Sequence, residues 1–310
     1  MLSDAPFEVP QYLLDLAKGL DRVPMAVAGA DNMVVMESAR QAADAGLIDP
    51  ILVGDRDEIE SLAETMGWAA SEFRIVESGE EDEAAAARMA VKLARDGEVA
   101  ALMKGHVHTD ALMAAVVAKE TGLRDGRRLS HVFHMTVPGS DRVLMITDGA
   151  VNVNPNPNTL MDIVKNAVGL AHALGNPEPK VAMLSGTESP IPAMPSSLVA
   201  KEIVERAQAG EVTGAIIDGP FAFDNAISPE AAKVKGIDSP VAGNADILVV
   251  PNIEMGNGLF KMLVYFKSGL AAGVVLGAKV PIVLTSRADP PEARFAATAI
   301  AAIAAAKGKV

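Results

Sequence analysis

The chain has 310 residues, half of them apolar and few of them aromatic, and it carries a formal net charge of -13. This length exceeds the size at which one core usually stops growing, so we expect two domains, and the composition favours helices that alternate with buried parallel strands. The acidic charge argues against an extended nucleic-acid surface, and the absence of cysteine excludes disulfides, thiolate metal sites and a cysteine nucleophile.

The first part of the chain alternates apolar runs with amphipathic segments. It opens with Asp4 and Glu8 where a signal peptide would carry basic residues, so we expect a cytoplasmic protein. The segment EDEAAAARMAVKLARDG has acids in its first turn and basic residues with glycine in its last, as a helix prefers. Around it, apolar runs predict four strands of a parallel α/β pattern, at 23–28, 51–53, 73–76 and 99–103.

A second series of strands follows further along the chain. Polar or small residues come after four of them, and ligands of open α/β sheets bind beyond the carboxyl ends of the strands, so we expect the chemistry there. The stretch from Gly269 to Leu284 is apolar but interrupted by glycine, lysine and proline, which predicts a helix, a turn and a strand and no membrane span. The strands of this series are predicted at 132–137, 143–147, 181–185, 215–218 and 247–250.

Two pairs of histidines raise the question of a metal site. His106 lies two residues before His108, with Asp110 nearby as a third possible ligand, and His131 lies close to His134. Because the chain has no cysteine and no HExxH motif, we favour turn, core or hydrogen-bonding roles for these side chains and expect no metal.

Two strand-to-helix junctions are rich in turn residues. After the strand that ends at Thr147 and Asp148, which we expect to face a cleft, an Asn-Pro run predicts a rigid turn with Asn158 or Thr159 as the N-cap of a helix. The run GNG at 256–258 allows close approach of a ligand but is usually only a turn. The absence of Walker A and GxGxxG motifs argues against an NTPase and an ordinary dinucleotide-binding domain.

The segment SRADPPE at 286–292 follows an apolar run that Pro290 and Pro291 bring to an end. Asp289 as N-cap and Glu292 three residues later would form a capping box at the start of the last helix. Ser286 and Arg287 have no part in that turn, and an arginine between a strand end and a helix start is well placed to hold a phosphate. We therefore expect these two residues to face the cleft.

Six segments occur in an order that resembles a known family. Together they resemble the phosphate acetyltransferase and phosphate butyryltransferase family over almost the whole chain, and SHV and TSRAD are most similar to the butyryltransferase branch. The segments are SHVFHM at 130–135, ITDGAVN at 146–152, LSG at 184–186, DGPFAFDNAIS at 218–228, NADILVVPNIEMGNGLFK at 244–261 and LTSRAD at 284–289.

The resemblance implies a fold and a reaction. The fold would be α/β, with two lobes around a cleft as in the isocitrate and isopropylmalate dehydrogenases, one lobe formed by 1–128 plus 279–310 and the other by 129–278. The reaction would be the reversible transfer of an acetyl or butyryl group between CoA and inorganic phosphate, with acyl phosphate as the other substrate. The resemblance implies no cofactor, since CoA is a substrate. It also implies a homodimer.

The resemblance also implies roles for individual residues. Ser286 would hydrogen-bond the CoA thiol or the oxyanion, and Arg287 would neutralise phosphate charge. The general base stays open among Glu292, Asp289 and none, because Ala293 stands where the acetyltransferase branch has an aspartate. Contacts to CoA or phosphate are expected from Lys104, Ser130, Thr147, Asp148, Ser185, Asp218, Gly256, Asn257 and Gly258.

A second departure from the family pattern leaves alternatives open. Many relatives have an arginine where this chain has Ala114, so another cation would have to bind phosphate. This departure keeps open a non-catalytic paralogue that binds acyl-CoA or acyl phosphate. A metal- and NAD-dependent oxidative decarboxylase of the related fold is less favoured, because its aspartate cluster and adenine-loop signature are not evident. The cations that could substitute are Lys104, Arg124, Arg127 and Arg128.

Overall fold

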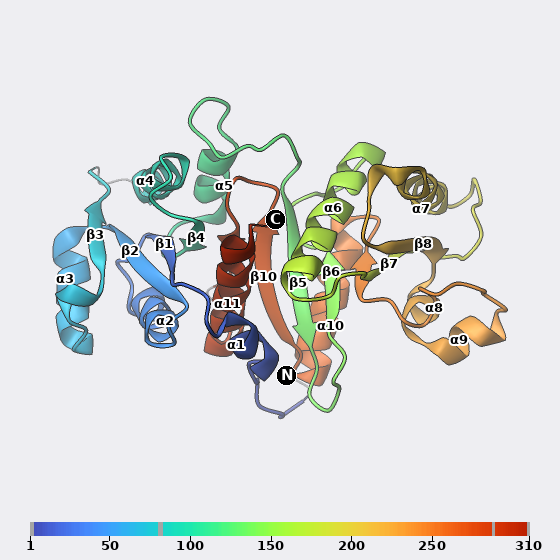
Figure 1. Ribbon diagram of the computed structural model, residues 1–310, viewed down its shortest axis with the longest axis horizontal. Helices are drawn as coiled ribbons and strands as arrows, with labels where there is room; N and C mark the ends of the chain where they lie inside the picture. Colours follow the sequence, from blue (N-terminus) through green and yellow to red (C-terminus); the bar gives the residue numbers. More distant parts are fainter. Residues whose placement is uncertain (1–2, 80–82, 287–288, 309–310) are drawn as a thin grey trace. The chain divides into compact units, whose positions relative to one another are not determined.

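The computed structural model describes residues 3–79, 83–286 and 289–308 (Figure 1). The chain groups into two compact units. The terminal unit comprises Val9–Arg127 and Ala272–Val310, and the central unit comprises Met1–Glu8 and Arg128–Ala271. The predicted domains differ from these units at their boundaries. Residues 1–8 and 128 were predicted in the first domain but group with the central unit, and residues 272–278 were predicted in the second domain but group with the terminal unit.

The terminal unit is built on a sheet with the strand order β3-β2-β1-β4-β11-β10. All of its neighbouring strands are parallel except β10 and β11, which pair antiparallel. The strands are β1 (Val23–Ala28), β2 (Ile48–Gly54), β3 (Arg74–Glu77), β4 (Ala101–Lys104), β10 (Leu270–Leu276) and β11 (Ile282–Val283).

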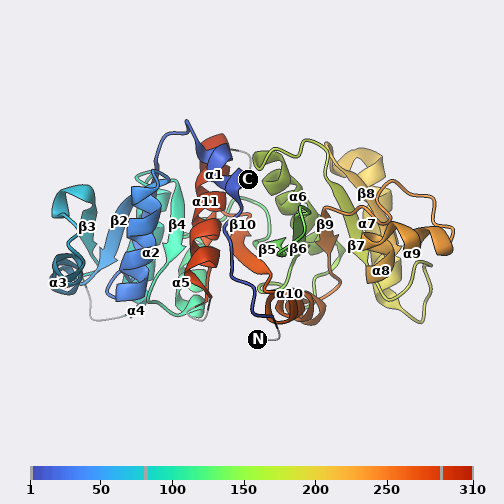
Figure 2. The same cartoon turned by 90° about the horizontal axis from the view of Figure 1, so that it is seen from below.

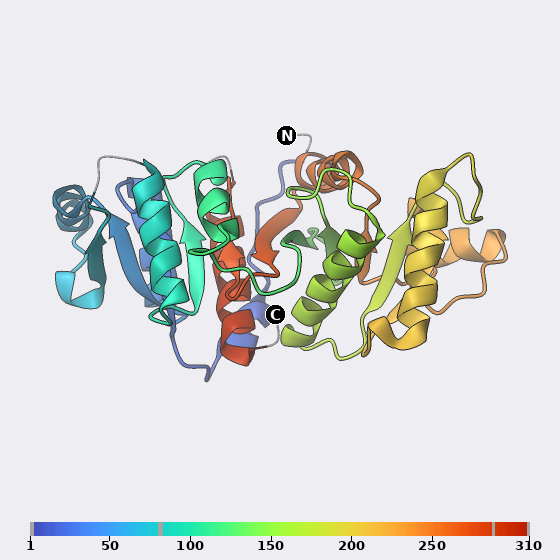
Figure 3. The same cartoon turned by 90° about the horizontal axis from the view of Figure 1, so that it is seen from above.

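Helices cover both faces of this sheet. Helices α4 and α5 lie on one face, and α2 and α11 lie on the other, where α11 also contacts α1 (Figures 2 and 3). Helix α11 is apolar on all sides and almost wholly buried, as expected of a helix without a polar face. The helices are α1 (Gln11–Ala17), α2 (Met33–Asp44), α3 (Arg56–Met66), α4 (Glu83–Arg95), α5 (Thr109–Val117) and α11 (Pro291–Lys307), with a short 3-10 helix at Ala70–Glu72.

The central unit has a sheet with the order β5-β6-β9-β7-β8, in which only β5 and β6 pair antiparallel. Helices α6 and α7 cover one face, and α8 and α10 contact the other (Figures 2 and 3). The strands are β5 (Ser130–Thr136), β6 (Leu144–Thr147), β7 (Lys180–Leu184), β8 (Ile216–Phe221) and β9 (Ile247–Val249). The helices are α6 (Pro157–Ala173), α7 (Pro195–Arg206), a π-helical turn at Ala207–Glu211, α8 (Phe223–Ile227), α9 (Pro229–Val234) and α10 (Ile253–Lys267).

Two local predictions are wrong. The stretch after Gly269 contains the strand β10 and not a helix, because a short, almost wholly buried apolar run has no periodicity that separates the two. Helix α6 is capped by Asn156, whose side chain accepts a hydrogen bond from the backbone N–H of Thr159 at 3.0 Å, with Pro157 as its first residue. Asn158 and Thr159 therefore lie inside the helix. Within the described residues, no helix is both long enough and apolar enough to cross a membrane.

Candidate active site

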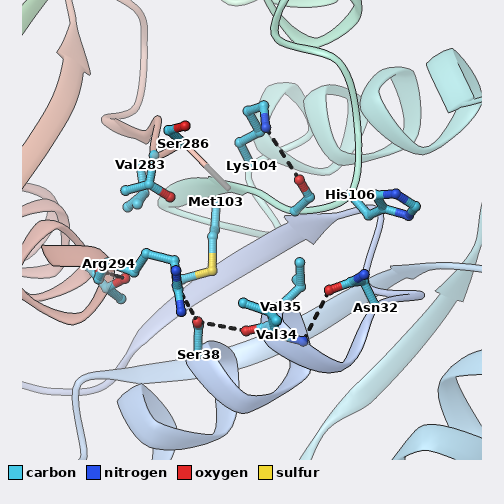
Figure 4. Close-up of a pocket in the computed structure, with 13 residues that line it drawn as sticks. Asn32, Val34, Val35, Ser38, Met103, Lys104, His106, Val283, Ser286 and Arg294 are labelled. Carbon is cyan, nitrogen blue, oxygen red and sulfur yellow. Dashed lines mark hydrogen bonds between the residues drawn. The ribbon is translucent and has the colours of Figure 1, made fainter. Parts of the chain in front are cut away.

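A cavity of about 180 Å³ lies in the terminal unit, at the carboxyl ends of β4 and β11 and between helices α2 and α11 (Figure 4). Its lining includes Lys104 and Ser286, both predicted from the sequence, together with Arg294. This is the edge of a parallel sheet at which α/β proteins bind their ligands. We call it the Ser286 pocket.

The strand register brings Lys104 and Ser286 to one edge. Strands β4 and β11 pair in parallel with Met103 opposite Val283, so the two strands end at the same edge of the sheet. The turn after β4 packs so closely on the turn after β1 that a side chain on Gly105 would overlap the carbonyl oxygen of Gly29. Glycine at position 105 thus allows the start of α2 to lie beside the end of β4.

Among the residues that the structure describes, two cationic side chains line the Ser286 pocket. Lys104 follows β4, and Arg294 projects from the first turns of α11. The Arg294 Nε donates to Ser38 Oγ at 3.0 Å, and its Nη1 donates to the backbone oxygen of Asp289, which fixes the guanidinium in place. The N-terminus of α2, capped by Asn32, borders the same cavity and favours negative charge. The arrangement suits an anion, although the whole chain is acidic.

The loop before α11 holds Ser286 at the cavity. Asp289 Oδ2 accepts a hydrogen bond from the Ser286 backbone N–H at 2.7 Å, and the Asp289 N–H donates to the Ser286 oxygen at 3.1 Å. Burial raises the pKa of the Asp289 carboxyl, while the bond from Ser286 and the charges of Arg294 and Lys104 oppose that rise.

The expected capping role of Asp289 is wrong. The N-cap of α11 is Pro290, which offers no side-chain cap, because the Asp289 carboxylate bonds back to Ser286 and not forward into the helix. Glu292 lies in the first turn of α11 and does not line the Ser286 pocket. Arg287 lies outside the described residues, and its predicted contact with phosphate stays a prediction.

In the central unit, Asp148 organises the loop after β6. Its carboxylate is almost completely buried and accepts four hydrogen bonds of 2.7–3.1 Å, from three backbone N–H groups and from the side chain of Asn152. Thr147 beside it donates its hydroxyl to the backbone oxygen of His131 at 2.9 Å. Both side chains therefore have structural partners, and their contact with substrate stays a prediction.

The start of α10 packs on this same loop. A Cβ on Gly256 would lie 2.8 Å from the backbone oxygen of Asp148, so glycine is needed there for packing, whereas a Cβ on Gly258 would meet open space. The Asn257 side chain donates to the Gly149 oxygen at 3.4 Å. Close packing therefore explains Gly256 but not Gly258.

The other predicted contacts of the central unit also have local partners. Ser130 Oγ accepts from the buried side chain of Asn166 at 2.9 Å, and Ser185 Oγ lies 2.9 Å from Ser196 Oγ. Asp218 accepts a bond from the N–H of the next residue at 2.8 Å. A role of these residues in binding CoA or phosphate stays a prediction.

The histidines do not form a metal centre with other ligands in the part of the chain that the structure describes. No group of three His, Asp or Glu side chains there could hold a metal ion. His131 and His134 are buried in β5, and burial lowers the pKa of His134 to about 4, so its imidazole is neutral at physiological pH. His106 instead lines the Ser286 pocket, with its Nδ1 3.3 Å from Asp31 Oδ1.

Residues 80–302 match the protein family described as phosphate acetyl/butaryl transferase. The chain belongs to this family. A phosphate acetyltransferase of Rhizobium meliloti is 49% identical over 269 residues, which cover 87% of this chain and 84% of the relative. A phosphate butyryltransferase of Clostridium acetobutylicum is 41% identical over 288 residues, 93% of this chain and 95% of the relative. The family and the class of enzyme, a phosphate acyltransferase, are confirmed, and relatives of both names match.

Solved structures agree on the fold. A branched-chain phosphotransacylase from Enterococcus faecalis V583 superposes with a TM-score of 0.79 at 33% identity, covering 91% of this chain and 99% of the other. A 4-hydroxythreonine-4-phosphate dehydrogenase from Klebsiella pneumoniae, at 13% identity and a TM-score of 0.56, covers 92% of this chain and 100% of the other and shares the fold alone. The predicted fold class, a dehydrogenase-like α/β fold, is confirmed.

Sequence reasoning missed Arg294 in this phosphate acyltransferase. The sequence did carry one signal for this residue. Arg294 comes three residues after Pro291, in the first turns of the predicted helix, where the helix dipole disfavours a cation. A cation at such a position needs a partner or a ligand. Here its partners are Ser38 and the backbone of Asp289.

Proposed function

We propose that the chain transfers a short acyl group between CoA and inorganic phosphate in the Ser286 pocket. One observation carries the proposal: the hydroxyl of Ser286 and the cations Lys104 and Arg294 line the same cavity, beside the N-terminus of α2. These groups can bind an acyl phosphate with its phosphate on the cations and its carbonyl oxygen near the hydroxyl. The names of the relatives support the same substrates.

The reaction follows from that placement. The CoA thiol loses its proton, which ends on the leaving phosphate; its sulfur attacks the carbonyl carbon, and Ser286 donates a hydrogen bond to the oxyanion that forms. Lys104 and Arg294 neutralise the phosphate, so that it leaves when the carbon–oxygen bond breaks. The rate enhancement comes from the positioning of the two bound substrates and from electrostatic stabilisation, without a cofactor or a covalent enzyme intermediate. Arg287 keeps its proposed place as a further phosphate ligand.

The groove beside Ala114 contains cations of the facing helix. Ala114 lines a groove of about 460 Å³ between α4 and α5, and Arg88, Lys92 and Arg95 of α4 line the same groove. These positions follow the helical spacing i, i+4 and i+7, so they share one face of α4. Lys92 and Arg95 pair with Asp96, and the groove lies on the face of the sheet opposite α2 and α11, so these cations do not supply the Ser286 pocket with the charge that Ala114 lacks. The non-catalytic paralogue stays the alternative.

The exposed face of α10 supports the proposed homodimer. The inward side of α10 packs on the central unit, where Phe260 stacks on Phe133 with ring centroids 3.8 Å apart. On the outward side, Met262, Tyr265 and Phe266 are each at least 50% exposed. A helix that is apolar on both sides favours burial by a partner, and a second copy of the chain is the occupant proposed. Sedimentation of Phe266→Glu as a monomer would support this surface.

The activity test is thioester formation from CoA with acetyl phosphate or butyryl phosphate, followed as loss of free thiol. Ser286→Ala should lower kcat by about 10²–10³, the usual effect of losing one oxyanion donor. Ser61→Ala, an exposed serine of α3, is the matched control and should have no effect. A folded wild-type protein without turnover of either substrate contradicts the proposal. Calorimetric binding of CoA in that case leaves the binding paralogue as the function.

The cysteine-free composition supports a cytoplasmic location.

A further inference from the structure

Among the described residues that line the Ser286 pocket, one side chain is suited to accept a proton near neutral pH. Lys104 and Arg294 line the cavity, but amines and guanidinium groups ordinarily stay protonated at pH 7. The carboxylate of Asp289 is engaged by the Ser286 backbone N–H. His106 is the one imidazole among the lining residues that the structure describes, and imidazole ordinarily changes charge between pH 5 and 8.

His106 and Ser286 follow neighbouring strands of the sheet. Met103 and Val283 are paired residues of the parallel strands β4 and β11, and His106 and Ser286 each follow three residues later. Both residues therefore lie at the same edge of the sheet, with Ser286 on the β11 side of β4 and His106 on the β1 side (Figure 4). The backbone N–H of His106 donates to the Gly29 oxygen at 2.7 Å, which anchors this residue to the end of β1.

Asp31 lies beside one nitrogen of the His106 ring. Asp31 Oδ1 is shielded from solvent, has no hydrogen-bond partner of good geometry among the described residues, and lies 3.3 Å from His106 Nδ1. A carboxylate oxygen in that position favours the tautomer with the proton on Nδ1, which leaves the lone pair on Nε2. The same charge stabilises the imidazolium after it takes up a proton.

We propose that His106, oriented by Asp31, takes the proton from the CoA thiol. The proposal rests on the proposed function and assigns the base that the sequence left open. The S–H bond breaks and the proton moves to His106 Nε2. The thiolate then forms the C–S bond, the C–O bond to phosphate breaks, and the leaving phosphate oxygen takes the proton from Nε2. The net change is acyl phosphate plus thiol to thioester plus hydrogen phosphate, and the histidine is regenerated.

Other charged groups around His106 fit this role. Asp31 approaches from the turn after β1, Lys104 from β4, and Arg294 from α11, with Asp289 in the loop before α11. Bound phosphate offsets the charge of the two cations. His106 can then accept a proton when the substrates are in place.

The test is the pH dependence of thioester formation by His106→Asn. At pH 7 kcat should fall by about 10²–10³, within the usual effect of a general base. The deficit should shrink as pH approaches the thiol pKa, about 8.5 for an ordinary thiol, because thiolate then forms without a base. His172→Gln, in the central unit, is the matched control and should keep the wild-type profile.

Each outcome of this test decides the inference. Wild-type kcat in a folded His106→Asn variant contradicts it, and so does an equal loss at every pH, which indicates a structural or phosphate-binding role. If that variant does not fold, Asp31→Asn replaces it and should shift the acid limb of the pH–rate profile to lower pH, because the imidazolium loses its counter-charge. An unshifted limb contradicts the inference. A wild-type protein without turnover contradicts the proposed function instead.

Discussion

Replacing Arg294 by glutamine should weaken the binding of acyl phosphate more than that of CoA. The guanidinium lines the Ser286 pocket and is held by Ser38 Oγ at 3.0 Å and by the backbone oxygen of Asp289. A guanidinium has five N–H donors, so these two bonds leave donors for a phosphate oxygen. Glutamine removes the charge and most of these donors.

The size of the effect follows from one lost charged hydrogen bond. Such a bond is worth about 1.5–3 kcal/mol. Since about 1.4 kcal/mol corresponds to a factor of ten, kcat/KM for acyl phosphate should fall roughly 10- to 150-fold. Arg294→Lys keeps the charge but not the planar arrangement of donors, so its kcat/KM should lie between those of the wild type and Arg294→Gln.

Initial rates over a range of both substrates measure this effect. The KM for acyl phosphate and the inhibition constant of inorganic phosphate should both rise, while the KM for CoA changes little. Arg22→Gln, an exposed residue 3.7 Å from Asp49, is the control and should behave as the wild type. An unchanged KM for acyl phosphate in Arg294→Gln, with an unchanged melting temperature, would refute the contact with phosphate.

Two further substitutions test the packing and the charges of the structure. In α10, Gly256→Ala should destabilise the fold by about 1–3 kcal/mol, because its Cβ would lie 2.8 Å from the Asp148 oxygen, whereas Gly258→Ala should stabilise it by about 0.5–1 kcal/mol. Urea unfolding measures both, and equal effects contradict the packing. For Asp289, burial raises the carboxyl pKa, so its stabilising contribution is present below the ordinary aspartate pKa and is lost as pH rises through the raised value. The melting temperature of Asp289→Asn relative to the wild type should therefore climb with pH, and a constant difference contradicts that reading.

The sequence predicted the strand ends better than the side-chain partners. Ser286 and Lys104 line one cavity because the carboxyl ends of parallel strands share an edge, and that rule needs only the order of the elements. The strand β10 was predicted as a helix because its apolar run is buried on both faces and shows no period. The arrangement of the elements was thus predictable, except where the pattern carries no periodicity.

The contacts of individual polar groups could not be predicted in the same way. Asp289 fits a capping pattern, yet its carboxylate bonds to Ser286, because the preceding loop folds back. The pairing of His106 with Asp31 joins residues 75 positions apart along the chain and has no local signal. Such pairings are decided by the packing of turns from different strands, which a single sequence does not show.

The discontinuity of the terminal unit affects the order in which the protein matures. Strand β11, helix α11 and most of strand β10 complete that unit, and they leave the ribosome only after the whole of Arg128–Ala271. The central unit can therefore fold while the terminal unit still lacks two strands of its sheet, β10 and β11, and one helix of its cover. A chain released early, or cleaved before Arg294, has no Ser286 pocket. The Ser286 pocket forms only on a chain that has been synthesised through helix α11.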